Sequence, residues 1–143
     1  MITKEITFNT PEYRNSLSLR SKILRLPLGK ELSAADTQGE DNQIHFGCWS
    51  GDQLIACVLA KPTEDQSRVK LRQMAVAQSY QGQGVGTKLI LNFEKLLQTR
   101  GIRSIELSAR RTAILFYQKL AYTELGSAYL EQGIEHIKMQ KDI

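Results

Sequence analysis

The chain has 143 residues, of which 41% are hydrophobic and 24% charged, and its formal net charge at pH 7 is +4. At roughly 100–200 residues per domain, we expect residues 1–143 to form one domain with a core of its own. No apolar run approaches the ~20 residues of a membrane span, and the N-terminus lacks the apolar stretch of a secretory signal, so we predict a cytoplasmic protein that binds no membrane.

The first part of the chain predicts one strand and one helix. Residues 3–8 indicate a short edge strand. Pro11 suits the first turn of a helix, and leucine and isoleucine among charged residues make 12–26 amphipathic until a Pro-Leu-Gly segment ends it. Residues 31–42 are polar and predict a loop or a short helix.

The next elements are rich in β-forming residues. Residues 43–49 and 53–60 predict a hairpin, and residues 69–76 a third strand that ends in an apolar run, as central strands do. Cys48 and Cys57 in the hairpin are expected to be small buried side chains. With two histidines and no metal-binding spacing in the chain, we predict neither a metal site nor a disulfide framework.

Helices and strands alternate in the second half of the chain. The predicted elements are a helix over 85–99, a strand over 102–108, a helix over 112–120, and strands over 122–126 and 133–140 around a loop bearing Glu131. With the hairpins before them, they predict a mixed α/β fold: a largely antiparallel central sheet of six to seven strands with helices on both faces.

Charge is distributed unevenly. Residues 68–119 hold ten basic and two acidic side chains, whereas residues 31–67 hold seven acidic and one basic. A solvated surface would explain this pattern, and so would a polyanionic ligand held by the basic segment with a cationic partner on the acidic side. The basic residues are dispersed and no nucleic-acid-binding motif accompanies them, so we predict no nucleic-acid partner.

A glycine-rich turn joins the third predicted strand to the helix that follows it. Gly82, Gly84 and Gly86 remove Cβ atoms where main-chain N–H groups converge, and the start of a helix favours an anion. A P-loop and the dinucleotide-binding fingerprint both need a glycine where Thr87 stands, so neither fits. The pattern that remains is Gln-x-x-Gly-x-Gly, beginning at Gln81.

This pattern resembles the pyrophosphate loop of the GCN5-related N-acetyltransferase (GNAT) superfamily. Residues 71–76 resemble that family's fourth strand, and residues 113–122 its A-x-x-F-Y-x-K-x-G-F segment, in the same order and spacing. Ser108 stands where the family often has asparagine, and its hydroxyl can still form hydrogen bonds. Ala121 stands where the family has glycine, which predicts a helix ending without a left-handed residue.

The resemblance implies acetyl-CoA as donor and a small-molecule or peptide primary amine as acceptor, with direct transfer in a ternary complex and no metal. The acidic residues of 31–67 favour a cationic amine. The alternative is a non-catalytic acyl-CoA-binding module that regulates a partner. Monomer and homodimer both remain open.

The resemblance also implies which residues contact the coenzyme. Main-chain N–H groups of residues 81–87 would bind the pyrophosphate, and an N–H near Met74 would polarise the thioester carbonyl. The implied cofactor-binding residues are Met74, Ala75, Val76, Gln81, Gly82, Gln83, Gly84, Val85, Gly86, Thr87, Ser108, Ala113, Phe116 and Lys119.

Three residues are candidates for catalysis. Tyr117 occupies the family's position for the proton donor to the leaving thiolate, and a phenol with a pKa of ~10 stays protonated at neutral pH. Simple packing beside Phe116 is the alternative. Glu131 and His136 are candidates for the base that deprotonates the amine, unless they are a solvated loop acid and an ordinary strand histidine.

Overall fold

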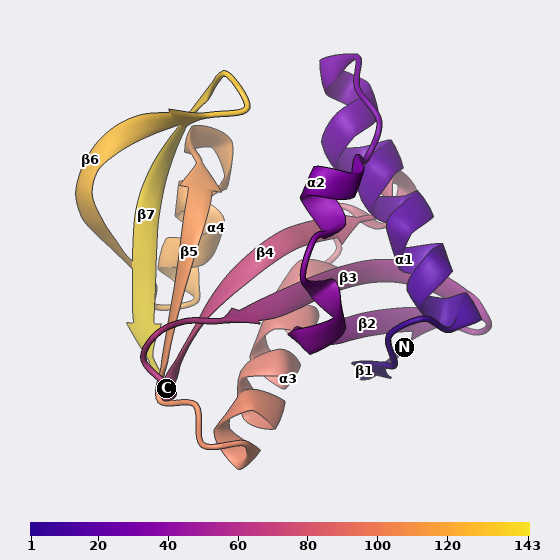
Figure 1. Ribbon diagram of the computed structural model, residues 1–143, viewed down its shortest axis with the longest axis horizontal. Coiled ribbons are helices and arrows are strands. Elements are labelled where there is room, and N and C mark those ends of the chain that lie inside the picture. The colour runs from indigo at the N-terminus through magenta and orange to yellow at the C-terminus, as the bar shows by residue number, and fades with distance from the viewer.

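The computed structural model describes residues 1–143. Seven strands form one sheet in the order β1-β2-β3-β4-β5-β7-β6 (Figure 1). The strands are β1 (Ile2–Ile6), β2 (Ile44–Ser50), β3 (Gln53–Pro62), β4 (Arg68–Val76), β5 (Ser104–Arg110), β6 (Thr123–Glu131) and β7 (Ile134–Asp142). The helices are α1 (Pro11–Arg20), α2 (Ala34–Thr37), α3 (Val85–Thr99) and α4 (Ile114–Lys119). None of these helices combines the length and apolarity that crossing a bilayer would require.

Strand pairing confirms the predicted mixed, largely antiparallel sheet. Every neighbouring pair is antiparallel except β4 and β5, which are parallel. Successive side chains of a strand point to opposite faces, so β3 supplies Cys57 to the layer under α1 and Val58 to the layer under α3. Helices therefore cover both faces of the sheet, as the pattern predicts.

Two elements differ from their predicted bounds by five residues or more. The helix expected over 12–26 keeps α-helical geometry only to Arg20. A wider π-turn over Ser21–Arg25 and a 3-10 turn over Leu26–Leu28 follow it. The α-helix cannot continue because Pro27 has no N–H group to donate. The predicted loop around Glu131 is wrong. Glu131 is the last residue of β6, since Gln132 and Gly133 both take positive φ, at 54° and 72°, and close a tight hairpin.

The sheet opens between β4 and β5. Their pairing is restricted to the stretch from Arg68 to Lys70 on β4 and from Ser104 to Glu106 on β5, after which the strands diverge (Figure 1). The gap therefore separates a β1–β4 half that carries α1 and α2 from a β5–β7 half that carries α4.

A bulge lies within the open part of β4. Pairing with β3 shifts register there, and Gln73 takes a positive φ of 55°. The side chain of Gln73 accepts a hydrogen bond from Nε of Arg20, at 3.2 Å. Arg20 is fully buried and donates to Glu40 at 2.8 Å, and Tyr13 donates to the same carboxylate at 2.8 Å. Burial alone would raise the pKa of Glu40, but these bonds hold it below its ordinary value.

Candidate active site

The glycine-rich loop presents a row of free main-chain donors at the start of α3. None of the N–H groups from Gly82 to Thr87 donates a hydrogen bond within the chain; the N–H of Gln81 donates to Gln78. The side chains of Gln81 and Gln83 fasten the loop by donating to the carbonyls of Val76 and Ser79, each at 2.9 Å. Six consecutive N–H groups at a helix N-terminus make an anion cradle.

The three glycines have two different reasons for being there. Gly82 and Gly84 take positive φ, at 74° and 81°, with open space where a side chain would stand. Gly86 has an ordinary φ, but a Cβ there would lie 2.8 Å from Cε of Met74 and 3.3 Å from Cζ of Phe116. The first two shape the cradle, and the third allows α3 to pack closely against Met74 and Phe116.

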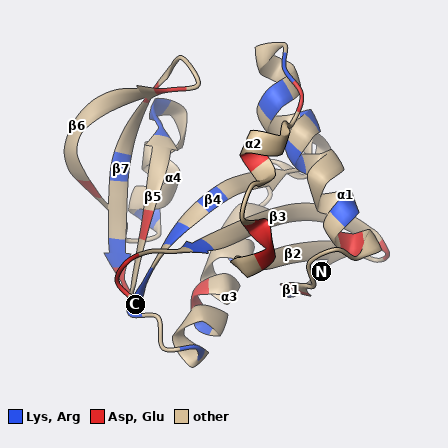
Figure 2. Cartoon of the chain, in the orientation of Figure 1, with Lys and Arg blue, Asp and Glu red and all other residues tan.

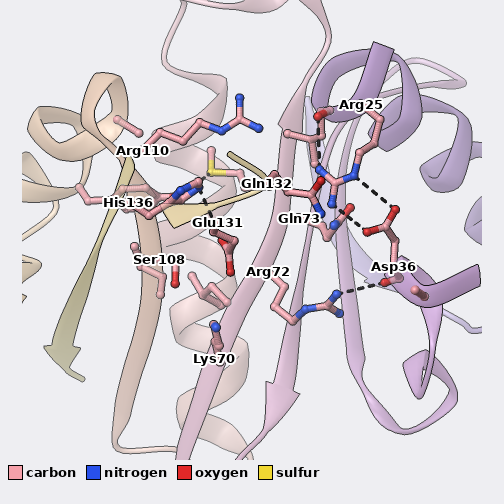
Figure 3. A pocket seen from close by; sticks show the side chains of 17 residues that line it. Arg25, Asp36, Lys70, Arg72, Gln73, Ser108, Arg110, Glu131, Gln132 and His136 are labelled. Atoms are coloured by element: carbon pink, nitrogen blue, oxygen red, sulfur yellow. Dashed lines mark hydrogen bonds and ion pairs between the residues drawn. The ribbon is translucent and has the colours of Figure 1, made fainter. Parts of the chain in front are cut away.

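A cavity of about 350 Å³ occupies the gap between β4 and β5. One wall is the open part of β4 together with Arg25, from the π-turn after α1, and Asp36, from α2. The other wall combines β5, Tyr117 of α4 and the tip of the β6–β7 hairpin (Figure 3). The two sides are bridged by Nζ of Lys30, which donates to the side chain of Gln132 at 3.1 Å.

Tyr117 lies on the cavity wall beside β4. Its side chain is 8% exposed, and its hydroxyl donates to Sδ of Met74 at 3.3 Å. Its ring also packs edge-on against Phe116, with centroids 5.0 Å apart. Both predicted roles are thus compatible with its place: the ring is part of the core, and the hydroxyl reaches the cavity. Burial raises the pKa of Tyr117 to about 12, so the phenol is protonated throughout the physiological range.

Glu131 and His136 face each other across the hairpin, with Oε2 and Nε2 3.6 Å apart (Figure 3). Nδ1 of His136 lies 2.7 Å from the carbonyl oxygen of Ile134. A carbonyl only accepts, so Nδ1 carries a proton and Nε2 is the nitrogen left to take one up. Protonation of Nε2 would create an ion pair with Glu131, so the pair can hold a proton at the cavity.

The other predicted coenzyme residues are spread over several parts of the fold. Met74, Ser108 and Ala113 line the cavity, and Ser108 is hydrogen-bonded to the hydroxyl of Tyr129. Ala75 is buried under α1, Val76 packs against the main core, and Lys119 is exposed on α4. The cradle lies outside the cavity, at the start of α3.

The prediction that α4 ends without a left-handed residue is wrong. Ala121 takes a φ of 73°. The N–H groups of Ala121 and Tyr122 donate to the carbonyls of Gln118 and Tyr117, each at 3.0 Å, and so close a Schellman motif. These two bonds offset the strain that alanine experiences there.

Several charged residues of the cavity were missed from the sequence. Arg25 forms an ion pair with Asp36 at 2.9 Å, and Nη2 of Arg72 donates to the main-chain oxygen of Asp36 at 3.0 Å (Figure 3). Asp36 is the one carboxylate of the acidic 31–67 segment that lines the cavity. Lys70 and Arg110 also line it. The uneven charge of the chain was the available signal, but spacing alone could not assign these residues to one cavity.

Comparison with known proteins places this site in a family. Residues 29–143 match the family model described as "Acetyltransferase (GNAT) domain". The chain is 27% identical over 140 residues to the "Uncharacterized N-acetyltransferase YitI" of Bacillus subtilis, covering 94% of each protein. It is 31% identical over 74 residues to the "Uncharacterized protein YyaT" of the same organism, a match that covers 52% of this chain and half of that relative.

A solved structure shares the fold. An aminoglycoside 6'-N-acetyltransferase complexed with coenzyme A matches with a TM-score of 0.78 and 20% identity, over 99% of this chain and 97% of that one. The seven-stranded mixed sheet is therefore an acetyltransferase fold.

Proposed function

The chain belongs to the GNAT acetyltransferase family, and we propose that it transfers the acetyl group of acetyl-CoA directly to a primary amine within a ternary complex. The observation that carries the proposal is the row of six free N–H groups beside a cavity that contains a buried phenol. An acyl-coenzyme A suits both features at once, because it carries a pyrophosphate as well as a thioester.

The residues present fit coenzyme A. The N–H groups from Gly82 to Thr87 would hold its pyrophosphate, at the positive end of the α3 dipole. Beyond the cradle, the open end of β4 offers main-chain groups to the extended amide-bearing arm, as an edge strand offers them to a peptide. The bound coenzyme would supply an activated acetyl group near Met74, where a main-chain N–H would stabilise negative charge on the carbonyl oxygen.

Tyr117 is suited to stabilise the departing sulfur. A phenol with a pKa of about 12 is a weaker acid than a thiol in water, whose pKa is ~8.5. Burial disfavours the charged thiolate, so a hydrogen-bond donor beside the departing sulfur stabilises it. The Tyr117 hydroxyl stays protonated at neutral pH and can donate to the developing thiolate.

The acceptor enters as an ammonium ion with a pKa near ~10 and must lose a proton before it attacks. Glu131 attracts the ammonium, and Nε2 of His136 takes up the proton directly or through water. Both residues lie on the β6–β7 hairpin, across the cavity from Arg25 and Asp36 (Figure 3).

Calorimetry with acetyl-CoA and a thiol-release assay with a broad panel of primary amines test the proposal. We expect saturable binding of acetyl-CoA, and thiol release that depends on the amine. Absence of binding to both CoA and acetyl-CoA would contradict the proposed function. Binding without amine-dependent thiol release across the panel would instead identify a non-catalytic acyl-CoA-binding module.

A further inference from the structure

The charges around the cavity do not cancel. Arg25 is paired with Asp36, and Nη1 of Arg72 lies 3.7 Å from the buried carboxylate of Glu40. Lys70 and Arg110 line the cavity but form no hydrogen bond or ion pair with any side chain of the protein. Two carboxylates line the cavity, those of Asp36 and Glu131. Glu131 is the one that forms no ion pair with an arginine or a lysine. Two free cations therefore face one free anion.

Lys70 is not part of the pyrophosphate cradle. The cradle follows the C-terminal end of β4 at Val76, whereas Lys70 lies on the same strand four residues before Met74. At about 3.3 Å per residue, Lys70 and the cradle lie on opposite sides of Met74 along the strand. An anion bound at Lys70 would therefore be a different one from the pyrophosphate.

Lys70 and Arg72 form the basic floor of the cavity. They alternate along β4, so they point to the same face of the sheet, and Figure 3 shows both below Glu131. Arg72 is held by the carbonyl of Asp36 and by the side chain of Gln43, both at 3.0 Å. Of the two β4 cations, only Lys70 therefore has an uncommitted donor group. Figure 2 shows that basic residues recur along β4 and β7, on the two sides of the gap.

We propose that the acceptor is a small primary amine that also carries an anionic group, a carboxylate or a phosphate, and that Lys70 binds this group. The inference rests on the proposed function, since it concerns the acceptor of that same reaction. The amine lies toward Glu131 and His136, and the anionic group lies on the floor of the cavity. A cavity of about 350 Å³ limits such an acceptor to a small molecule or the end of a peptide.

This assignment differs from the cationic amine that the acidic 31–67 segment predicts. Within that segment, Glu40 is buried against Arg20 and Asp36 is bound by Arg25, so neither carboxylate is free for a cationic acceptor. These two carboxylates form structural ion pairs, and the free positive charge of the cavity comes from β4 and β5.

Matched acceptor pairs test the proposal with the full-length protein and acetyl-CoA. One arm compares amino acids with their primary amides, and the other compares O-phosphoethanolamine with ethanolamine, with kcat/KM from thiol release as the readout. A charge-assisted hydrogen bond predicts that kcat/KM for the anionic member of a pair is higher by about tenfold or more. The two arms distinguish a carboxylate from a phosphate.

The variant Lys70→Gln tests whether Lys70 is the source of this preference. We expect the advantage of the anionic acceptor to fall by about tenfold, mainly through KM, with kcat/KM for the neutral partner changed by less than about twofold. Lys95→Gln removes the same charge from the exposed face of α3 and should leave the preference intact.

The outcomes separate the two proposals. Thiol release with equal kcat/KM for both members of every pair overturns the assignment of the acceptor and leaves the acetyltransferase proposal standing. A preference that survives in Lys70→Gln overturns the role of Lys70. Binding of acetyl-CoA without thiol release for any amine overturns the proposed function and this inference with it.

Discussion

The hydroxyl of Tyr117 donates to the sulfur of Met74, and this 3.3 Å contact is the only hydrogen bond that the hydroxyl forms. A thioether is a weak acceptor. The donor can therefore turn to a better acceptor in the cavity at small cost, which is what stabilisation of a departing thiolate requires.

Tyr117→Phe should reduce kcat by about 10²–10⁴-fold, the usual range for a positioned proton donor, with little change in acetyl-CoA affinity. Stability should fall by no more than about 1 kcal/mol, because the lost bond is weak. Steady-state thiol release, calorimetry and thermal unfolding measure the three quantities.

Tyr122→Phe is the matched control for this experiment. Tyr122 is also a buried phenol, and it donates to Glu94 at 2.8 Å within the core. This variant should lose stability and keep its activity. Equal kcat values for the two variants would show that the Tyr117 hydroxyl has no catalytic role.

Substitution in the cradle should weaken coenzyme binding. Gly84→Ala puts a Cβ on a residue with a φ of 81°, which costs about 1–2 kcal/mol of strain. Relief of that strain rotates the adjacent peptide groups, so the N–H donors no longer converge, and acetyl-CoA affinity should fall by about tenfold or more. Calorimetric titration measures the change.

Gly51→Ala provides the comparison. Gly51 has a φ of 58°, also with open space around the missing Cβ, but it lies in the β2–β3 hairpin. The two variants should lose similar stability, while only Gly84→Ala loses affinity. If both bind acetyl-CoA as the wild type does, the loop is not the pyrophosphate site.

Glu131→Gln should change the pH dependence of the reaction. Without this carboxylate the cavity no longer attracts the ammonium form of the acceptor next to His136, so kcat/KM near pH 7 should drop by about tenfold or more. Activity should recover at higher pH, where the neutral amine is more abundant. Glu135→Gln, on the same hairpin and bonded to Arg111 instead, should keep the wild-type pH profile. Identical profiles for the two variants would exclude Glu131 from proton transfer.

His45 should make the protein less stable in mild acid. Its Nε2 lies 2.8 Å from the carbonyl of Glu40, and its buried Nδ1 has no hydrogen-bond partner. Burial lowers the pKa of His45 below its ordinary value of 6.5. The unfolded chain therefore binds more protons, so the stabilisation is fully present above pH 6.5 and is lost as pH falls below that value.

Chemical unfolding between pH 7.5 and 5 measures this loss, and His45→Gln should flatten the dependence. His136→Gln, which changes the only other histidine, should retain it. A dependence that follows His136 would contradict the assignment to His45.

Local patterns made the sheet and the glycine-rich turn before α3 predictable from the sequence. The helix over 85–99 has the predicted bounds, because its apolar period is regular and glycines mark both ends. Tyr117, Glu131 and His136 line one cavity together, although they come from α4, β6 and β7.

The bulge in β4 and the cavity depend on contacts between residues far apart in the sequence, so no local pattern predicts them. The bulge at Gln73 replaces a regular strand residue by one with a positive φ, and its partner Arg20 lies 53 residues away. The cavity walls combine the Arg25–Asp36 segment with β4, β5 and the hairpin, so the acceptor side emerges only once these elements are placed in space. At Ala121 the residue type itself predicts the wrong backbone conformation. Two hydrogen bonds at the end of α4 hold it at a positive φ that alanine alone disfavours.

The buried pair of Arg20 and Glu40 has a consequence for where the autonomous folding unit begins. The recognisable family segment starts at residue 29, after α1, yet Glu40 inside that segment has its charge neutralised by a guanidinium outside it. Excision at residue 29 would leave the Glu40 carboxylate with only its 3.7 Å contact to Arg72 and would release the β4 bend from Arg20. The segment that the family model matches is therefore shorter than the unit that these contacts hold together.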